Sequence, residues 1–363
     1  MTMLLFSLLV FVLLLELFVA GILVVRRFLQ PKGPFTISIN DEKTIQVAES
    51  DKLLAHLYAA GVFIPSSCGG RGTCGLCRVQ VIHPKTTCTA LEEEHLNVQE
   101  RKNGFHLACM VRVNSSMSIR VPADILGVRE VQANVVSNML IAPDITHLIL
   151  QIPEDFHFAA GQYVQVRIEA PHIPRGFEFR AYSVASDPNV RGTLELAIRR
   201  VPNGLGSPWL HARQPGDIVQ ITGPYGEWRL DPDPQRELLL VGGGVGVTPL
   251  RSILYAATRI PHKRVHFYFG VRTQQDLFWE KEWESLQKRF PHWKLICALS
   301  HEPSPSPWQG SRGFVHEIVE STWEPKSNAL QVFVCGPPVM TQAVLHVLEE
   351  KGISPDVIYT DTF

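Results

Sequence analysis

The chain begins with a long run of apolar residues, after which the pattern changes. Between Met3 and Val25, eighteen of 23 positions are Leu, Ile, Phe or Val, and Glu16 carries the one charge. At about 1.5 Å per residue, a helix of this length spans about 34 Å, enough to cross the hydrocarbon core of a bilayer. The apolar residues favour insertion by roughly 5–11 kcal/mol, against about 3 kcal/mol for Glu16. The pattern therefore predicts a transmembrane helix within residues 1–30.

Basic residues flank this run on one side. Arg26, Arg27 and Lys32 follow it, and no Lys or Arg precedes it. A cleaved signal peptide, the alternative interpretation, carries its positive charge before the apolar run. By the positive-inside tendency, we expect a single-pass protein of the inner membrane whose remaining domains face the cytoplasm. Glu16 then either meets a polar partner, such as another subunit, or stays protonated.

Alternating apolar and polar positions predict a mixed α and β domain in residues 34–126, after a Pro- and Gly-rich linker at 31–34. The expected elements are strands at 36–39 and 44–47, joined as a hairpin, and a helix at about 53–60. Thr89 and Glu92 have the spacing of a capping box, which predicts a further short helix.

Two more blocks follow, with different patterns. Residues 127–235 contain short strand-like runs separated by Gly, Pro and Asn, which predicts an antiparallel β-barrel. These runs lie at 131–136, 147–151, 163–168, 194–199 and 218–222. Residues 236–363 alternate strands with helices, which predicts an α/β domain with a parallel sheet. Its strands are expected at 238–241, 265–269, 295–299, 332–334 and 357–359. No internal repeat is visible.

Composition narrows the possible classes of protein. The 363 residues are 45% apolar and 19% charged, which suits packed cores and excludes a disordered chain. The net charge of −1 gives no electrostatic reason to expect nucleic-acid binding. Seven cysteines are too few for a disulfide scaffold of this size, and three of them lie within ten residues.

The clustered cysteines form the strongest chemical signal. The segment Cys68-Gly-Gly-Arg-Gly-Thr-Cys74-Gly-Leu-Cys77 is followed by Cys109, and four thiolates are the ligand count of a 2Fe–2S cluster. The intervening glycines allow backbone N–H groups to approach the sulfur atoms closely. Zinc is the alternative, but zinc sites usually pair two Cys-x-x-Cys knuckles, and Cys109 stands alone. Of the remaining cysteines, we expect Cys88 and Cys297 to be ordinary thiols.

This block resembles the plant-type ferredoxins. The resemblance implies a ferredoxin-like β-grasp fold of the α+β class around a 2Fe–2S cluster. Five residues separate Cys68 from Cys74 where the plant type has four, and the longer loop resembles the ferredoxin domains of bacterial reductases.

Three motifs in the second block resemble the flavin domain of the ferredoxin–NADP reductase superfamily. The first is Arg180-Ala-Tyr182-Ser183, in which the resemblance implies that Arg holds a pyrophosphate, Tyr contacts the flavin and Ser183 reaches its N5 atom. The other two supply Gly204, Gly206 and Ser207, before a short helix at 208–211, and then Gly223 and Tyr225. Together they imply FAD, with FMN as the lesser alternative.

The third block carries a strand followed by a glycine turn, with Thr248 expected as helix N-cap and Pro249 at the first helical position. This turn resembles the superfamily's own dinucleotide turn and supplies Gly242, Gly243, Gly244, Gly246, Thr248 and Pro249 as cofactor-binding residues. The resemblance also places Cys335, Gly336 and Pro337 beside the nicotinamide, where the Cys aligns hydride transfer. It implies that the C-terminal Phe363 stacks on the flavin and that Asp361 is the acid near it.

The choice between NADH and NADPH depends on charge. A 2′-phosphate requires basic partners. The superfamily's NADPH users often carry Ser-Arg where this chain has Ser300-His301, and Asp276 would repel a phosphate near the ribose. We therefore expect NADH, although Arg272 and Arg312 could supply positive charge.

The order of the blocks, together with the N-terminal helix, resembles the F-subunit family of the sodium-translocating NADH:quinone reductases. The resemblance implies electron flow from NADH to FAD, then to the 2Fe–2S cluster and on to other membrane subunits, with quinone reached indirectly. The stretch from Glu169 to Phe179 is shorter than is typical of that family. Two alternatives remain: the reductase component of a phenol or methane oxygenase, and a membrane-tethered carrier with an inactive flavin site. The downstream electron acceptor could also be a different one.

Overall fold

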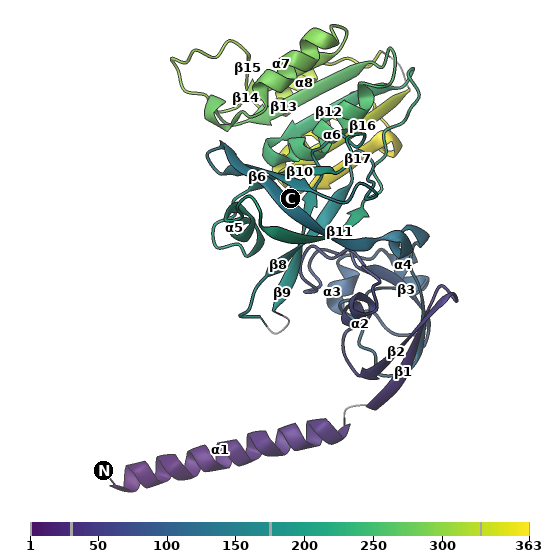
Figure 1. The fold of residues 1–363 in the computed structure, drawn as a ribbon, viewed down its shortest axis with the longest axis vertical. Coiled ribbons are helices and arrows are strands. Elements are labelled where there is room, and N and C mark those ends of the chain that lie inside the picture. The colour runs from purple at the N-terminus through teal and green to yellow at the C-terminus, as the bar shows by residue number, and fades with distance from the viewer. Residues whose placement is uncertain (1, 30–31, 174–175, 327–328, 363) are drawn as a thin grey trace. The chain divides into compact units, whose positions relative to one another are not determined.

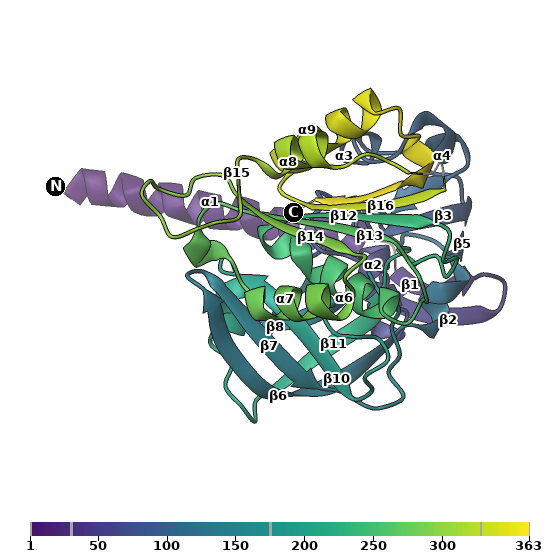
Figure 2. The same cartoon turned by 90° about the horizontal axis from the view of Figure 1, so that it is seen from above.

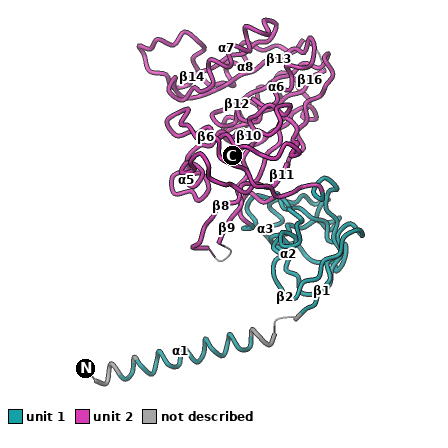
Figure 3. The backbone as a smooth tube through the Cα atoms, viewed as in Figure 1, with its two compact units in different colours: residues 1–64, 70–126 teal, residues 65–69, 127–363 magenta. Residues whose placement is uncertain are grey.

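The computed structural model describes residues 2–29, 32–173, 176–326 and 329–362. Contacts within the chain divide it into two compact units (Figure 3). Unit 1 comprises residues 1–64 and 70–126, and unit 2 comprises residues 65–69 and 127–363. The second and third sequence blocks therefore share one compact unit.

The apolar run near the N-terminus is helical. Helix α1 spans Thr2–Leu29 (Figure 1), which confirms the helix predicted over residues 3–25 and extends it at both ends. Its apolar side chains from Leu9 to Val25 are exposed. In the part of the chain that the structure describes, no helix is long and apolar enough to cross a membrane.

Unit 1 contains a five-stranded mixed sheet in the order β2-β1-β5-β3-β4. Its strands are β1 Lys32–Ile39, β2 Lys43–Glu49, β3 Arg78–His83, β4 Phe105–Leu107 and β5 Met117–Arg120. The predicted hairpin is confirmed, with Ile39 opposite Lys43, and β1 pairs in parallel with β5. The predicted linker at 31–34 is wrong for Lys32 onwards, because these residues already belong to β1.

Three short helices lie in the connections between the strands of this sheet. They are α2 Leu53–Ala59, α3 Ala90–Glu93 and α4 Val98–Lys102, followed by the 3₁₀ turn η1 Ala123–Gly127. Leu53, Leu54 and Leu57 recur at helical spacing and are buried, so α2 packs on one apolar face. The predicted capping box is confirmed at the start of α3, where Thr89 accepts from the Glu92 N–H and Glu92 accepts from the Thr89 N–H.

The first half of unit 2 is an antiparallel sheet in the order β10-β7-β6-β11-β8-β9. The strands are β6 Arg129–Ala142, β7 Ile145–Gln151, β8 Tyr163–Glu169, β9 Phe177–Ser183, β10 Thr193–Arg199 and β11 Ile218–Tyr225, with helix α5 Gly206–His211. The two end strands approach each other, because the N–H of Ala185 after β9 donates to the Glu195 carbonyl of β10 at 2.8 Å. The sheet thus curls into the barrel predicted from the strand pattern.

The second half of unit 2 is a parallel sheet in the order β15-β14-β13-β12-β16-β17. Its strands are β12 Glu237–Gly243, β13 Val265–Val271, β14 Lys294–Leu299, β15 Ser311–Arg312, β16 Leu330–Gly336 and β17 Ile358–Thr362. Its helices are α6 Val247–Ala257, α7 Glu280–Arg289, α8 Val315–Thr322 and α9 Pro338–Glu350, with the 3₁₀ turns η2 Gly244–Gly246, η3 Gln274–Asp276 and η4 Pro355–Val357. The predicted α/β lobe is confirmed, and β15 is an additional short strand.

Helices lie on both faces of the parallel sheet. Figure 2 shows α8 and α9 on one face and α6 and α7 on the other, between the sheet and the barrel. The core on the α6 and α7 face includes Ala142, Ile145 and Ala197 from the barrel together with Phe267 and Phe269 from the sheet. This continuous core explains why the barrel and the α/β lobe form one unit. The carboxyl ends of the parallel strands are where open α/β sheets bind ligands.

Candidate functional site

Three of the four predicted cluster ligands come together in unit 1. Cys77 and Cys109 are buried and their thiols are hydrogen-bonded, and Cys74 lies close enough to act on Cys77 electrostatically. The contact with Cys109, together with burial, raises the pKa of the Cys77 thiol well above its usual range. Cys68 is half-buried in the short segment 65–69, and none of the seven cysteines, all of which the structure describes, forms a disulfide. Crowded buried thiols of this kind fit a soft metal centre that takes thiolate ligands.

Gly70 fixes the shape of the cysteine loop. Its φ of +81° is in the left-handed region, and an added Cβ would lie 3.7 Å from the Cys109 Cβ, which is ordinary van der Waals contact. Its carbonyl accepts a hydrogen bond from the Lys52 Nζ at 3.0 Å. The position therefore requires glycine for its backbone conformation and not for space.

The two halves of the predicted flavin site meet at Gly206. An added Cβ there would lie 2.8 Å from both the Arg180 Cγ and the Tyr182 hydroxyl oxygen, so only glycine fits between strand β9 and helix α5. Ser207 uses its hydroxyl to accept from the Val201 N–H at 2.9 Å, which closes the turn before the helix. Gly204 lies within this turn, and its N–H donates to the Val201 carbonyl at 3.0 Å.

Arg180 has a partner that the sequence did not reveal. Its guanidinium forms an ion pair and hydrogen bond with Glu178 and donates to the Phe179 carbonyl at 2.8 Å. Burial raises the pKa of the Tyr182 phenol above its usual range, so this side chain stays neutral. Ser183 ends β9 opposite Tyr163. Polar and cationic groups are thus aligned along one strand, as a pyrophosphate and flavin edge would require.

The third flavin motif is mostly internal to the barrel. Tyr225 is buried, and its hydroxyl donates to the Thr222 Oγ1 at 3.0 Å. Its ring stacks on Tyr163 with centroids 5.4 Å apart. Gly223 has a φ of +154° and packs against Val164. The motif therefore shapes the barrel end, and its contact with a cofactor remains a prediction.

The predicted dinucleotide turn meets the end of a neighbouring strand. An added Cβ at Gly246 would lie 2.1 Å from the Cys335 carbonyl oxygen, and one at Gly243 would lie 2.3 Å from the Met340 Sδ. Strand pairing places Gly242 beside Cys335 and Cys335 beside Asp361. Motifs that are far apart in the sequence therefore share one row at the carboxyl ends of β12, β16 and β17.

Other residues of the turn are placed differently from the prediction. Helix α6 begins at Val247 with Gly246 as its N-cap, so the N-cap predicted at Thr248 and the first position predicted for Pro249 are both wrong. The Thr248 hydroxyl instead donates back to the Val245 carbonyl at 2.5 Å. Gly244, with a φ of +56°, lies against the guanidinium of Arg199 from strand β10. Gly336 has a φ of +154°, and Pro337 is the N-cap of α9.

The strand ends also carry a thiol and a carboxyl group. Burial, with a smaller contribution from Asp361, raises the pKa of the Cys335 thiol well above its usual value, so the thiol is neutral. Desolvation raises the pKa of the Asp361 carboxyl. Phe363 lies outside the described residues.

Asp276 lies in η3, beyond the end of β13, near Glu302, whose carbonyl accepts from Arg312 at 3.4 Å. Its Oδ2 accepts from the N–H and the hydroxyl of Thr273 at 2.9 and 2.8 Å, which caps η3. The Glu302 carboxylate accepts from the Gln274 N–H at 2.7 Å in the same region. Two carboxylates here disfavour a 2′-phosphate and suit the hydroxyl groups of a ribose.

A buried ion cluster that no sequence motif indicated joins the barrel to the α/β lobe. Arg251 of α6 donates to Glu195 of β10 at 2.7 Å and to Glu282 of α7 at 2.7 Å. His147 of β7 also contacts the Glu195 carboxylate at 2.9 Å. The Arg251 guanidinium lies 4.4 Å from the ring centroid of Trp279. The one sequence signal was Arg251 itself, the single charged residue in the segment that forms α6.

Comparisons with known proteins match all three blocks. The 2Fe-2S iron-sulfur cluster binding domain matches residues 37–114, the oxidoreductase FAD-binding domain residues 132–230, and the oxidoreductase NAD-binding domain residues 240–346. The chain is 33% identical to the F subunit of the Na(+)-translocating NADH-quinone reductase of Neisseria gonorrhoeae, covering 94% of this chain and 95% of that protein. It is 32% identical to the protein of the same name from Pseudomonas aeruginosa, covering 95% of each.

Two solved structures share the architecture. The cytochrome P450 reductase GcoB of Amycolatopsis superposes with a TM-score of 0.71 at 31% identity, covering 91% of this chain and 98% of that one. The ferredoxin reductase in carbazole 1,9a-dioxygenase superposes with a TM-score of 0.68 at 27% identity, with the same coverage.

Proposed function

The chain belongs to the F-subunit family of the Na⁺-translocating NADH-quinone reductases, and on this premise we propose that it is the electron-input subunit of such a complex. It is an NADH-dependent oxidoreductase with FAD and a 2Fe–2S centre as its cofactors. Electrons pass from NADH through FAD and the cluster to a downstream acceptor. Its partners are NADH and the other subunits of the complex, and quinone is reached indirectly.

One observation supports this assignment above the others. Gly242, Cys335 and Asp361 occupy one row across three neighbouring parallel strands, at the edge where open α/β sheets bind ligands. The glycine turn from Gly242 to Gly246 and the segment from Cys335 to Pro337 would hold the NADH. Cys335 would border the nicotinamide, and because its thiol is buried and neutral, it would act there as a shaping group and not as a nucleophile.

The barrel would hold the FAD, which when bound supplies the step from a two-electron donor to a one-electron acceptor. Arg180 would bind the pyrophosphate, while its ion pair with Glu178 fixes the direction of the guanidinium. Tyr182 and Ser183 would border the flavin ring, and Gly206 leaves room for the Arg180 and Tyr182 side chains of the strand. Cys68, Cys74, Cys77 and Cys109 would hold the cluster.

Cys74→Ala tests the direction of electron flow. In the purified full-length protein, the variant should lose the visible absorption and electron paramagnetic resonance signal of the 2Fe–2S centre. NADH should still reduce the flavin, because the FAD and NADH residues lie in unit 2. Unchanged iron content would refute the ligand set, and loss of flavin reduction would refute independent flavin chemistry. Cys297→Ala is the matched control, since Cys297 lies in the sheet of the α/β lobe.

We further propose that residues 3–25 anchor the chain as a single-pass segment of the inner membrane, with the catalytic domains in the cytoplasm. The support is the apolar composition of α1, the exposure of its described side chains and the basic residues that follow it. Deleting residues 1–29 should move the protein from the membrane pellet to the supernatant while NADH-dependent reduction of ferricyanide continues. Full-length protein in the supernatant would refute the anchor.

The reductase component of an oxygenase is the second candidate function. The likeness to the P450 and dioxygenase reductases favours this function, because the superposition covers 98% of each of those two chains. Purification from membranes in mild detergent distinguishes the two. Co-purifying membrane subunits and quinone reduction support the electron-input role, and an oxygenase partner supports the alternative.

A further inference from the structure

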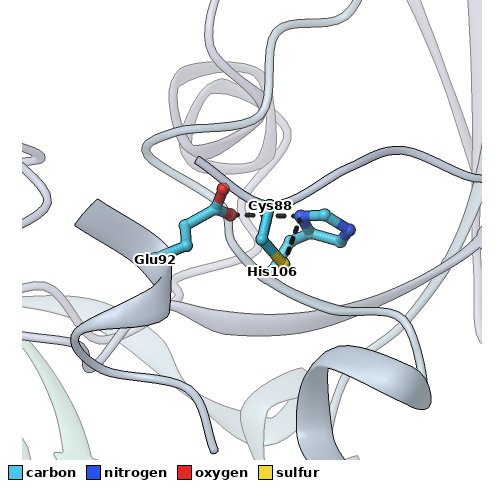
Figure 4. A group of neighbouring side chains, drawn as sticks. All are labelled: Cys88, Glu92 and His106. Atoms are coloured by element: carbon cyan, nitrogen blue, oxygen red, sulfur yellow. Dashed lines mark hydrogen bonds and ion pairs between the residues drawn. The ribbon is translucent and has the colours of Figure 1, made fainter. Parts of the chain in front are cut away.

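Cys88, Glu92 and His106 converge at a second point of unit 1, outside the predicted cluster ligands. Figure 4 shows that they come from a loop, a helix and a strand, and that the thiol and the carboxylate both face the His106 ring. One ligand atom from each lies within 4.8 Å of the other two. We propose that these three residues form a binding site for a single divalent transition metal of the zinc type.

The spacing of the donor atoms fits a tetrahedral ion. The Glu92 Oε1 is 3.1 Å from the His106 Nδ1, and the Cys88 Sγ is 3.9 Å from the same nitrogen. Zinc bond lengths place tetrahedral O and N ligands about 3.3 Å apart and S and N ligands about 3.6 Å apart. These two distances therefore differ from ligand distances by a few tenths of an ångström, and the Cys88 Sγ and the Glu92 Oε1 lie within 4.8 Å of each other. Water would be the fourth ligand.

The surrounding groups orient these ligands as they do in established metal sites. The His106 Nε2 lies 3.0 Å from the Thr86 hydroxyl oxygen, so its N–H can donate there and leave Nδ1 able to bind an ion. The Glu92 Oε2 accepts from the N–H and the hydroxyl of Thr89 at 2.7 and 2.9 Å. Its Oε1 accepts from the Leu107 N–H at 2.9 Å and retains a second lone pair.

A hydrogen-bonded pair of Glu92 and His106 without a metal is the competing interpretation. Both side chains are at most 3% exposed, and the buried carboxylate would then accept from the imidazole as well as from the Thr89 and Leu107 donors. The position of the thiol favours the metal interpretation, because the Cys88 Sγ, which donates to the Phe105 carbonyl at 3.7 Å, also lies 3.9 Å from the same nitrogen. Metal binding uses all three groups and involves no redox change, since the thiol proton leaves to solvent as the sulfur binds.

The site would fasten the segment that carries a cluster ligand. His106 lies in β4, three residues before Cys109, while Cys88 belongs to the loop between β3 and α3. A bound ion therefore joins the β3–α3 loop to the strand that leads to the buried Cys109. Sequence patterns did not pair Cys88 with these residues, because its two neighbours in space lie four and eighteen residues away along the chain.

Metal analysis of the full-length protein tests the site. Protein containing FAD and iron is incubated with Zn²⁺, passed through a desalting column, and analysed for zinc and iron. We expect about one zinc per chain with the iron content unchanged, and a zinc absorption edge spectrum that fits one sulfur and three nitrogen or oxygen ligands. Cys88→Ser and His106→Gln should each lower zinc affinity at least tenfold, and Thr86→Ala by about tenfold to hundredfold.

Cys297→Ser is the matched control, because it removes a half-buried thiol from the other unit and should retain zinc. The absence of zinc in the wild type, or equal zinc in Cys88→Ser and the wild type, would overturn the proposal. A spectrum with four sulfur ligands would also overturn it, since zinc would then occupy the cysteine loop. None of these outcomes depends on NADH oxidation.

Discussion

Gly70 and Gly246 lie in the two glycine-rich loops that are predicted to bind cofactors, yet each is glycine for a different physical reason. Gly70 has a φ of +81°, and an added Cβ would find its nearest neighbours at 3.5 and 3.7 Å. Gly246 has a φ of −61°, which any residue can adopt, but an added Cβ would lie 2.1 Å from the Cys335 carbonyl oxygen. Conformation excludes a side chain at the first position, and lack of space excludes it at the second.

The difference follows from how each loop is built. The cysteine loop runs between α2 and β3 through turns and bends, so the backbone itself must curve around the thiols. The dinucleotide turn stands at the end of β12, and its shape depends on how closely it packs against β16. A substitution at Gly70 should therefore act on backbone energy, and one at Gly246 on packing.

Gly246→Ala should have the largest effect. The methyl group cannot fit without moving the β16 end, since backbone atoms are the obstacle, and overpacking of this kind costs about 1–3 kcal/mol or more. We expect the rate of flavin reduction at low NADH concentration to fall at least a hundredfold, while the 2Fe–2S spectrum is unchanged. Stopped-flow absorbance measures both.

Gly127→Ala provides the matched control for that variant. An added Cβ at Gly127 has no neighbour within 4 Å, and its φ is outside the left-handed region. Flavin reduction should stay at the wild-type rate. A normal rate in Gly246→Ala would mean that the turn can shift to accept a side chain, and the distinction between the two glycines would fail.

Gly70→Ala should have a smaller effect, confined to unit 1. Space is available, so the cost is that of a left-handed backbone, about 1–2 kcal/mol. Thermal loss of the 2Fe–2S absorption should occur at a lower temperature, with NADH-dependent flavin reduction unchanged. Gly70→Asn should recover part of the loss, because Asn tolerates this conformation better than Ala. Equal loss in both variants would indicate a steric effect instead.

The sequence predicted local features well and long-range contacts poorly. Strand alternation located the barrel and the parallel sheet, and the spacing of Thr89 and Glu92 identified a helix start, because these signals lie within a few residues. The contacts of Glu92 with His106 and of Arg251 with Glu195 join residues 14 and 56 positions apart. Such pairs depend on the fold, and one sequence contains no pattern that specifies them.

The helix start after the glycine turn shows the same limit at short range. Thr248 followed by Pro249 matches the usual N-cap pattern, but the tight approach of Gly246 to β16 starts the helix earlier. Tertiary packing therefore overrode a local preference. The placement of Phe363 stays a prediction, since it lies outside the described residues.

Acid should slightly destabilise the α/β lobe, and so have a milder form of the effect expected for Gly246→Ala. Arg251 lies one turn into α6, the helix that starts beside Gly246, and its ion pair with Glu195 ties that helix to the barrel. Burial alone would raise the pKa of Glu195, but the hydrogen bond with His147 and the charge of Arg251 outweigh it, so the pKa lies below the usual 4.5. A carboxyl group whose pKa is lowered by folding stabilises the native state above its unfolded pKa, and this contribution is lost as the pH falls through the folded value.

We therefore expect the temperature at which the flavin is released, measured by the rise in its fluorescence, to be nearly constant from pH 7 to 5. This temperature should decrease when the pH is lowered below about 4.5. Glu195→Gln cannot titrate, so its release temperature should be lower at pH 7 but should fall less steeply in acid. The same slope in both proteins would assign the acid sensitivity to other carboxyl groups. Because the ion cluster and Gly70 lie in different units, the acid shift in flavin release should also be the same in Gly70→Ala as in the wild type. That result would establish that conformation in unit 1 and packing in unit 2 can be perturbed separately.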